Sequence, residues 1–270
     1  MKAKPKYYDE IQRLRLIDDE LMELCFNDNL EAAGLLVSVI LGREDLKIIS
    51  AKTQAVMKGV MREVRLDILA VDEEGRKYNI EFQRDNSGAV PERARYNSSM
   101  IDVNSLDKGG DFTELPEVYV IFITEHDVLG GGLPLYTIDW RINETGEVFG
   151  CRSHIVYVNG DHRDAATALG KLVHYIFCER PEEMNYSTLA ERVRYFKEDK
   201  KGVKDLSGVM EELVKTERAK EAKEQQKTIA QRMLEAGKLA LSEIAAYTGL
   251  SVSTVRRMAK KLEEAQAAQA

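Results

Sequence analysis

Two acidic side chains interrupt apolar, strand-like segments in the first third of the chain. Asp67 lies between Leu66 and Ile68, and Glu81 interrupts a similar segment further on. A carboxylate removed from water is costly unless a cation or strong hydrogen bonds compensate it. Hard oxygen ligands on adjacent strands are also what Mg²⁺ selects, with waters and a substrate phosphate completing its coordination. The two acids are therefore candidate metal ligands.

A β-hairpin can place these acids together. Residues 64–71 and 77–83 have strand character, and the turn residues 72–75 separate them, which is a hairpin signal. Alternation puts every second side chain of a strand on the same face. These sets are Arg65, Asp67 and Leu69 on the first strand, and Lys77, Asn79, Glu81 and Gln83 on the second. The simpler alternative is a hairpin with one solvated face, from which both acids point into water.

The elements around the hairpin predict a mixed α/β layer architecture, because helices come before, between and after strands. Residues 118–124 form a continuous apolar run that is typical of a central strand buried on both faces. In the helix expected after the hairpin, Tyr96, Met100 and Val103 share one apolar stripe. The other expected strands are 47–49 and 155–158, and the expected helices lie within 7–41 and over 91–106.

Composition narrows the class of protein. The chain has 270 residues, 39 Lys and Arg against 46 Asp and Glu, and a formal net charge of −7. This charge excludes a binder that holds nucleic acid by diffuse positive charge. No apolar run approaches the length needed to cross a bilayer, and the start of the chain does not resemble a signal peptide. We expect a protein without membrane contact.

The cysteines favour a reducing compartment. Cys25, Cys151 and Cys178 are widely spaced and form no C-x-x-C motif, which is typical of a cytoplasmic protein without disulfides. Cys151 and His154 are spaced like half of a zinc site, but no second pair with ligand spacing accompanies them. We expect them to be an ordinary small core residue and a loop histidine.

Composition and pattern divide the chain into three parts. Residues 1–196 are expected to form the main domain, and 197–228 a charged helical linker. The alternating charges of the linker predict a solvated helix with internal ion pairs, although a short helical dimer contact stays open. A C-terminal unit is expected over 229–270.

The order of these features resembles the PD-(D/E)XK nuclease family transposases, which are related to recombination-promoting nucleases. The resemblance covers residues 20–200 approximately and is carried by VRLDI at 64–68, YNIEFQ at 78–83 and RARYNSSMID at 93–102, with further similarity at 119–124 and 192–196. It implies an α/β fold of the restriction-endonuclease-like superfamily, with a mixed sheet flanked by helices.

The resemblance also implies a metal-dependent phosphodiesterase. Asp67, Glu81 and the main-chain carbonyl of Phe82 would hold Mg²⁺, with Mn²⁺ as a substitute. Glu31 precedes the sheet on a helix, where the superfamily often places a further acid. The alternative for Glu31 is an exposed carboxylate favoured by the helix dipole.

Gln83 departs from the superfamily pattern, which prescribes lysine at this position. The subfamily usually has glutamine here, and a neutral amide can orient a water by hydrogen bonding but cannot supply positive charge. Arg93 is the leading candidate for the missing cation, because it lies near the start of the next helix. A phosphate contact and a surface ion pair are equally open for Arg93.

The C-terminal segment 241–258 has the order of a helix-turn-helix. Ala245 lets the helices approach, Gly249 permits the turn, and Ser251 caps the second helix. A recognition helix would present four outward side chains to duplex DNA. They are Val252, Ser253, Arg256 and Arg257. The same small fold also serves in protein contacts, so both uses stay open.

Taken together with these patterns, the resemblance implies a Mg²⁺-dependent endonuclease that hydrolyses phosphodiester bonds of double-stranded DNA. The family suggests recombination, mobile elements or defence as its setting, and nucleases of this fold often form homodimers to cut both strands. The alternative is a catalytically inactive nuclease-fold protein that binds DNA or another protein. Gln83 favours that alternative, whereas the retention of Asp67 and Glu81 opposes it.

Overall fold

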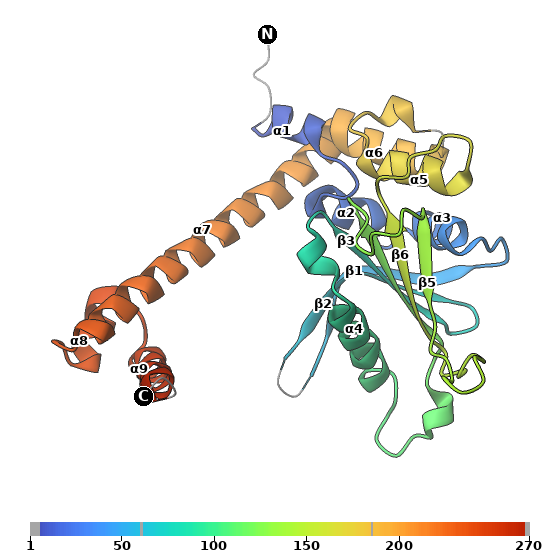
Figure 1. Cartoon of the computed structure of the whole chain (residues 1–270). Coiled ribbons are helices and arrows are strands. Elements are labelled where there is room, and N and C mark those ends of the chain that lie inside the picture. The colour runs from blue at the N-terminus through green and yellow to red at the C-terminus, as the bar shows by residue number, and fades with distance from the viewer. Residues whose placement is uncertain (1–5, 60–61, 185, 268–270) are drawn as a thin grey trace, which may run out of the picture. The chain divides into compact units, whose positions relative to one another are not determined.

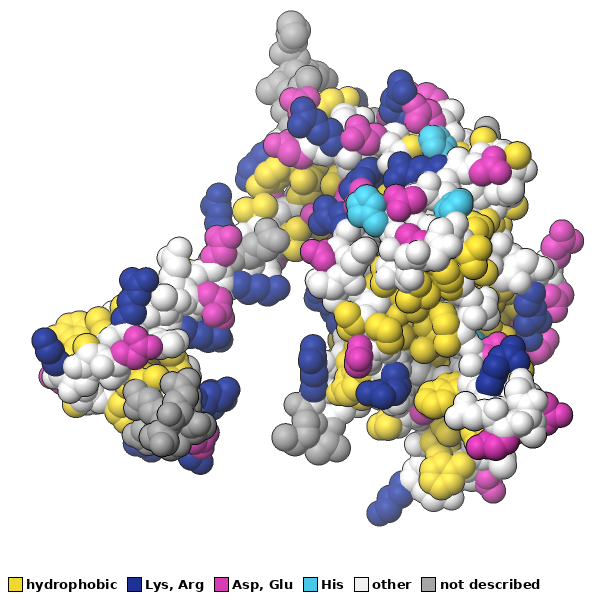
Figure 2. Space-filling model, in the orientation of Figure 1, with side chains coloured by type: hydrophobic (Ala, Val, Ile, Leu, Met, Phe, Trp, Pro, Cys, Tyr) yellow, Lys and Arg dark blue, Asp and Glu magenta, His cyan; other side chains and the backbone are white. Residues whose placement is uncertain are grey.

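The computed structural model describes residues 6–59, 62–184 and 186–267. Its contacts divide the chain into two units, residues 1–207 and 208–270. The domain limits expected near 196 and 229 stay predictions. A continuous helix, α7 (Lys200–Ala236), includes the unit boundary and most of the charged segment. Acidic and basic side chains alternate along it (Figure 2), with ion pairs such as Lys227 to Glu224.

The first unit is built on a mixed sheet, which Figure 1 shows flanked by helices. The described residues form six strands in the order β1-β2-β3-β4-β6-β5. β1, β2 and β3 are antiparallel, β3, β4 and β6 are parallel, and β5 is antiparallel to β6. The strands are β1 (Ile48–Met57), β2 (Val64–Asp72), β3 (Lys77–Gln83), β4 (Val118–Thr124), β5 (Leu135–Ile138) and β6 (Ser153–Asn159).

Helices cover both faces of this sheet. Phe26 on α2 packs against Phe82 of β3, with ring centroids 6.0 Å apart. α4 lies on the opposite face, where Ala94 and Ile101 join Val120 and other apolar side chains in one core cluster. The helices of this unit are α1 (Tyr8–Arg13), α2 (Asp19–Phe26), α3 (Leu30–Leu41), α4 (Pro91–Val103), α5 (Ala168–Phe177) and α6 (Ser187–Glu198), with short 3₁₀ turns at Asn86–Ala89, Phe112–Glu114 and Pro181–Glu183.

The mixed α/β fold, the hairpin and the central strand are confirmed, but the expected stripe on α4 is wrong. Tyr96 and Val103 are 41% and 66% exposed, whereas Met100 is buried. The helix instead turns Asn97 and Ser98 toward the sheet. The reason is that the facing side chains of β3 are polar, so α4 is held by hydrogen bonds as well as by apolar contacts.

Two strands also differ from expectation. β1 extends well beyond the short segment 47–49, and β5 was not anticipated. β1 pairs with β2 along nearly its whole length, so a partner strand stabilises residues whose own pattern is weak. β5 is only half-buried and contains few residues, which leaves little periodicity to detect.

The second unit contains a helix-turn-helix. α8 (Leu241–Thr248) and α9 (Val252–Ala267) are joined at Gly249, whose φ of 72° is a left-handed conformation that favours glycine. Ile244 and Val255 pack with Ala230 of α7 in a small apolar core. The backbone N–H of Thr254 donates to Ser251 Oγ at 3.2 Å, so Ser251 caps α9 as expected.

Among the described helices, none is by itself long and apolar enough to cross a membrane. Only α2 and α3 taken together satisfy the length and composition, and a bend of 109° separates them.

Candidate active site

The site lies where β2 and β3 separate. Their pairing runs from Val71 opposite Lys77 to Ile68 opposite Ile80 and then ends. Beyond this point the main-chain N–H groups that face the gap have lost their strand partners and need other acceptors. Asp67 lies at the fork, and we call this place the fork site.

The two acids satisfy the donors of the fork reciprocally. The Phe82 backbone N–H donates to Asp67 Oδ2 at 2.9 Å, and the Asp67 backbone N–H donates to Glu81 Oε1 at 3.3 Å. Each carboxylate therefore accepts a hydrogen bond from a backbone N–H of the other strand that has no strand partner. Asp67 is half-buried and Glu81 is fully buried, so neither points freely into water as the simpler alternative required.

The main-chain carbonyl of Phe82 faces the same gap. In an extended strand the N–H and C=O groups of one residue point to the same side, and the N–H of Phe82 points toward Asp67. The fork thus collects two carboxylates and a carbonyl, which are hard oxygen donors. This donor set fits a hard divalent cation such as Mg²⁺.

Arg93 brings the cation that Gln83 lacks. Its Nη2 donates to Glu81 Oε2 at 2.5 Å, and its Nη1 donates to Gln83 Oε1 at 3.2 Å and to the carbonyl of Gly88 at 3.0 Å. Its side chain is 35% exposed, whereas that of Glu81 is 0% exposed. The guanidinium therefore forms an ion pair with a buried carboxylate, where the sequence had left open a surface ion pair or a phosphate contact. The phosphate contact stays a prediction.

Two asparagines complete the buried contacts of Glu81. Asn79 Nδ2 donates to Glu81 Oε1 at 2.7 Å, and Asn97 Nδ2 of α4 donates to Asn79 Oδ1 at 3.0 Å. Sequence reasoning placed Asn79 on the correct face but gave it no role. The available signal was an amide two residues from the acid in a strand that is otherwise largely apolar, where it needs buried hydrogen-bond partners.

The pKa values of both acids are raised. For Asp67 the main cause is burial, and the nearby charge of Glu81 adds to it. Burial also raises the pKa of Glu81, although the hydrogen bond from Asn79 and the charge of Arg93 oppose the shift. One guanidinium thus does not fully compensate two buried carboxylates. A further cation would offset both the burial of the two acids and their mutual repulsion.

A different helix brings a further acid near the fork. The charge of Asp19, at the start of α2, contributes to the raised pKa of Asp67. Glu31 lies exposed on α3, where it accepts a hydrogen bond from Thr188 Oγ1 at 2.6 Å. It forms no hydrogen bond or ion pair with either fork acid. Asp19 was missed because only the packing of α2 shows its proximity.

A groove of about 560 Å³ lies beside the fork, between the start of β2 and the first turns of α4. Arg62, Arg65 and Arg93 line it together with acidic and neutral side chains. Arg93 lines this groove and also contacts Glu81, so this side chain connects the groove with the fork site. Its full lining is Arg62, Glu63, Val64, Arg65, Glu92, Arg93, Tyr96 and Asn97.

In the second unit, α9 presents its four expected side chains to solvent. Val252 is 42% exposed, and Ser253, Arg256 and Arg257 are also exposed. Val255, on the other side of the same helix, is fully buried. The helix therefore has a packed face and an open face that carries two adjacent arginines.

Comparison with protein families agrees with both units. Residues 41–159 match the PD-(D/E)XK nuclease family transposase, and residues 233–269 match the IclR helix-turn-helix domain. The first match includes Asp67, Glu81, Gln83 and Arg93. The chain therefore contains a PD-(D/E)XK nuclease-family domain followed by a helix-turn-helix, and the resemblance drawn from the sequence is confirmed. No curated protein and no solved structure matches the chain.

Proposed function

We propose that the protein is a Mg²⁺-dependent endonuclease that hydrolyses phosphodiester bonds of double-stranded DNA. The observation that carries this proposal is the fork site, where the carboxylates of Asp67 and Glu81 each accept a hydrogen bond from the other acid's strand and Glu81 also pairs with Arg93. The family supports a nuclease and suggests recombination, mobile elements or defence as its setting. A homodimer and a cytoplasmic location stay predictions from the family and the composition.

In this proposal Asp67, Glu81 and the carbonyl of Phe82 hold the metal ion, and Mn²⁺ can replace Mg²⁺. A bound divalent ion lowers the pKa of a water ligand and neutralises charge on the scissile phosphate. Asp19 contributes negative potential from α2. Glu31 has the weaker claim, because its carboxylate is engaged with Thr188.

Gln83 and Arg93 divide the work that lysine does elsewhere in the superfamily. The amide of Gln83 can hold and orient the attacking water, while Arg93 supplies positive charge for a phosphate in the groove. Glu81 Oε2 is the oxygen that Arg93 holds. A phosphate entering the groove offers the guanidinium a second anion and so leaves Glu81 freer to act as a ligand.

The helix-turn-helix supplies duplex binding in this proposal. Val252, Ser253, Arg256 and Arg257 form the open face of α9, and a recognition helix reads base edges and phosphates with such side chains. The net charge of −7 predicts weak non-specific affinity that falls quickly with salt. Productive cutting then depends on these local arginines.

Nicking of supercoiled plasmid in the presence of Mg²⁺ tests the enzyme. We expect wild type to nick the plasmid, and Asp67→Asn to lose this activity because a neutral amide is a poorer ligand. Asp107→Asn is the matched control, since Asp107 is an exposed acid outside the fork site. Chelation of divalent ions should stop the wild-type reaction.

The second candidate is a nuclease-fold protein that binds DNA without cutting it. The specific observation in its favour is that Gln83 replaces lysine while Arg93 is already bound to Glu81. If wild type nicks no more plasmid than Asp67→Asn under matched conditions, the proposal of an endonuclease is wrong and this second candidate replaces it.

A further inference from the structure

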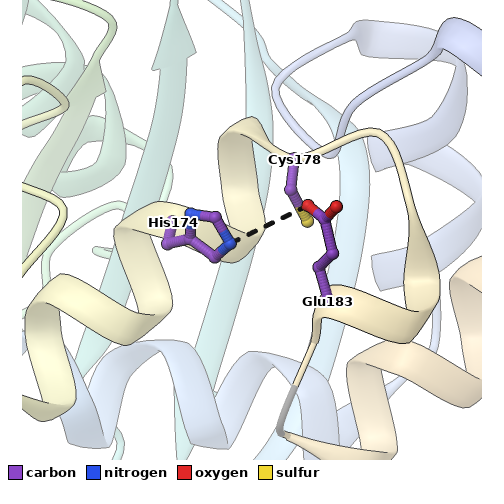
Figure 3. Close-up of side chains that lie close together, drawn as sticks. All are labelled: His174, Cys178 and Glu183. Atoms are coloured by element: carbon purple, nitrogen blue, oxygen red, sulfur yellow. Dashed lines mark ion pairs between the residues drawn. The ribbon is translucent and has the colours of Figure 1, made fainter. Parts of the chain in front are cut away.

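A separate group of metal-binding side chains lies at the end of α5 (Figure 3). His174, Cys178 and Glu183 each offer a ligand atom, and these atoms all lie within 4.8 Å of one another. His174 Nε2 and Glu183 Oε2 are 4.0 Å apart. Among the described residues, no other group of three His, Cys, Asp or Glu side chains meets this criterion. We call it the α5 cluster.

Local structure explains why these three residues meet. His174 and Cys178 are four residues apart, a spacing that puts side chains on one side of a helix. Cys178 is the C-cap residue, and the 3₁₀ turn Pro181–Glu183 then brings Glu183 back beside the helix end. The thiol is buried, whereas the side chains of His174 and Glu183 are 43% and 33% exposed. The cluster therefore has a buried sulfur and a side open to solvent.

The ligand types point to a transition metal. Zn²⁺ binds thiolate, imidazole and carboxylate at about 2.0–2.3 Å, which places tetrahedral ligands about 3.5 Å apart. The ligand atoms of the α5 cluster lie within 4.8 Å of one another, so they would have to move closer to hold the ion. A thiolate does not suit Mg²⁺ or Ca²⁺, which select oxygen ligands. We propose that His174, Cys178 and Glu183 bind Zn²⁺, with a fourth position open to water.

The contacts around the cluster are compatible with this site. Arg180 pairs with Glu183 through Oε1, whereas Oε2 is the oxygen closer to His174. One carboxylate can thus keep its arginine while its other oxygen binds the ion, as outer contacts of metal ligands often do. The Cys178 thiol faces the carbonyls of Tyr175 and Arg180 at 3.6 Å, so the bound form must exchange these weak contacts for the metal.

The surroundings of the Cys178 thiol favour its neutral form. Burial raises the pKa of this thiol, and the charge of Glu183 adds to the shift. Metal binding requires the deprotonated thiolate, so a bound ion would have to stabilise it against this cost. Zn²⁺ would also join the end of α5 to the turn that leads into α6.

Zinc titration of the full-length, untagged protein against a chromophoric chelator tests the site. We expect one Zn²⁺ per chain with the three ligands intact. Loss of an outer contact to a metal ligand costs roughly 10–100-fold in affinity, so loss of a ligand should cost at least this much. The variants are His174→Asn, Cys178→Ser and Glu183→Gln.

Cys151→Ser is the matched control, because Cys151 is an exposed free cysteine outside the cluster and not the core residue expected from the sequence. It should bind Zn²⁺ like wild type, and Co²⁺ should give thiolate-to-metal absorption in wild type and Cys151→Ser but not in Cys178→Ser. His174→Asn changes a partly exposed residue, so its effect does not depend on repacking a buried site.

A further control shows whether the zinc ion binds at the fork site instead of the α5 cluster. Asp67→Asn should retain full zinc stoichiometry, and excess Mg²⁺ should not displace the ion. Absence of Zn²⁺ from wild type would overturn the proposal. Equal affinity in wild type, His174→Asn and Cys178→Ser would also overturn it, as would loss of the ion in Asp67→Asn.

Discussion

The fork site and the open face of α9 use charge in opposite ways. At the fork, Glu81 is fully buried and is held by Arg93 and Asn79. On α9, Arg256 and Arg257 project into solvent beside a buried Val255. Charge in a low-dielectric site acts strongly on protonation and metal affinity, whereas exposed charge is screened by salt. This difference agrees with the proposed roles, chemistry at the fork and reversible contact with DNA on α9.

The largest expected effect separates cutting from binding. Combining Asp67→Asn with Glu81→Gln should lower the turnover number by at least about 10²–10³-fold, because removing even one preorganised electrostatic group from an active site has this effect. Affinity for duplex DNA should stay within a few-fold, because α9 is intact. Nicking rates at saturating plasmid and a filter-binding assay measure the two quantities. If DNA affinity falls together with turnover, the claim that the fork cuts DNA and α9 binds it is contradicted.

Arg93 should matter for stability as well as activity. Arg93→Ala leaves Glu81 buried without its cation, and breaking a buried pair costs about 3 kcal/mol of unfolding free energy, near the low end of the usual range because Arg93 is half-exposed. Arg93→Lys keeps the charge but not the forked contacts with Glu81 and Gln83. It should lose less stability than Arg93→Ala. Urea denaturation of the three proteins measures the difference, and equal midpoints would contradict it.

The raised pKa of Asp67 predicts that the stability of the folded protein depends on pH. The exposed arginines of α9 should not contribute to this dependence. Burial raises the pKa of Asp67 in the folded state, so the folded protein binds this proton more tightly than the unfolded chain. The resulting stabilisation is complete below the ordinary aspartate pKa of about 4 and is lost as the pH rises through the folded value.

Thermal unfolding without divalent ions checks this sign. Asp67→Asn mimics the neutral acid, so it should unfold at a higher temperature than wild type at high pH, and the gap should shrink as the pH falls. Added Mg²⁺ should stabilise wild type and leave Asp67→Asn unchanged. If the difference in unfolding temperature between wild type and Asp67→Asn does not change with pH, the titration of Asp67 is not its cause.

The smallest effect concerns the surface arginines. Arg256→Ala with Arg257→Ala should weaken duplex binding and reduce the slope of log affinity against log salt by about 2, roughly one for each lost phosphate contact. Folding should be unaffected, because both side chains are exposed. Lys223→Ala, which removes an exposed positive charge on α7 and outside α9, serves as a control. An unchanged salt slope in the double variant would contradict the proposal that this face of α9 contacts DNA.

Most of the correct predictions about the fold came from local periodicity in the sequence. Strand alternation placed Asp67 with Glu81, and the pairing of β2 with β3 agrees. The spacing around Gly249 likewise predicted the turn between α8 and α9. In both cases the information lies within a few residues, so no distant packing was needed to find it.

Contacts between distant elements could not be predicted in this way. The approach of Asp19 to Asp67 depends on how α2 packs, and the contact of Asn97 with Asn79 depends on how α4 lies on the sheet. The same limit applies to Arg93, whose position near a helix start was clear while its partner was not. A sequence shows which face a side chain occupies, whereas packing decides what it touches.

A crystal structure of the protein with Mn²⁺ tests the central claim most directly. The account predicts one anomalous peak at the fork, within coordination distance of a carboxylate oxygen of Asp67, one of Glu81 and the carbonyl of Phe82. It also predicts that Arg93 loosens its contact with Glu81 Oε2. No peak at the fork in crystals saturated with Mn²⁺, with Arg93 still bound to Glu81, would contradict the assignment of these acids as metal ligands.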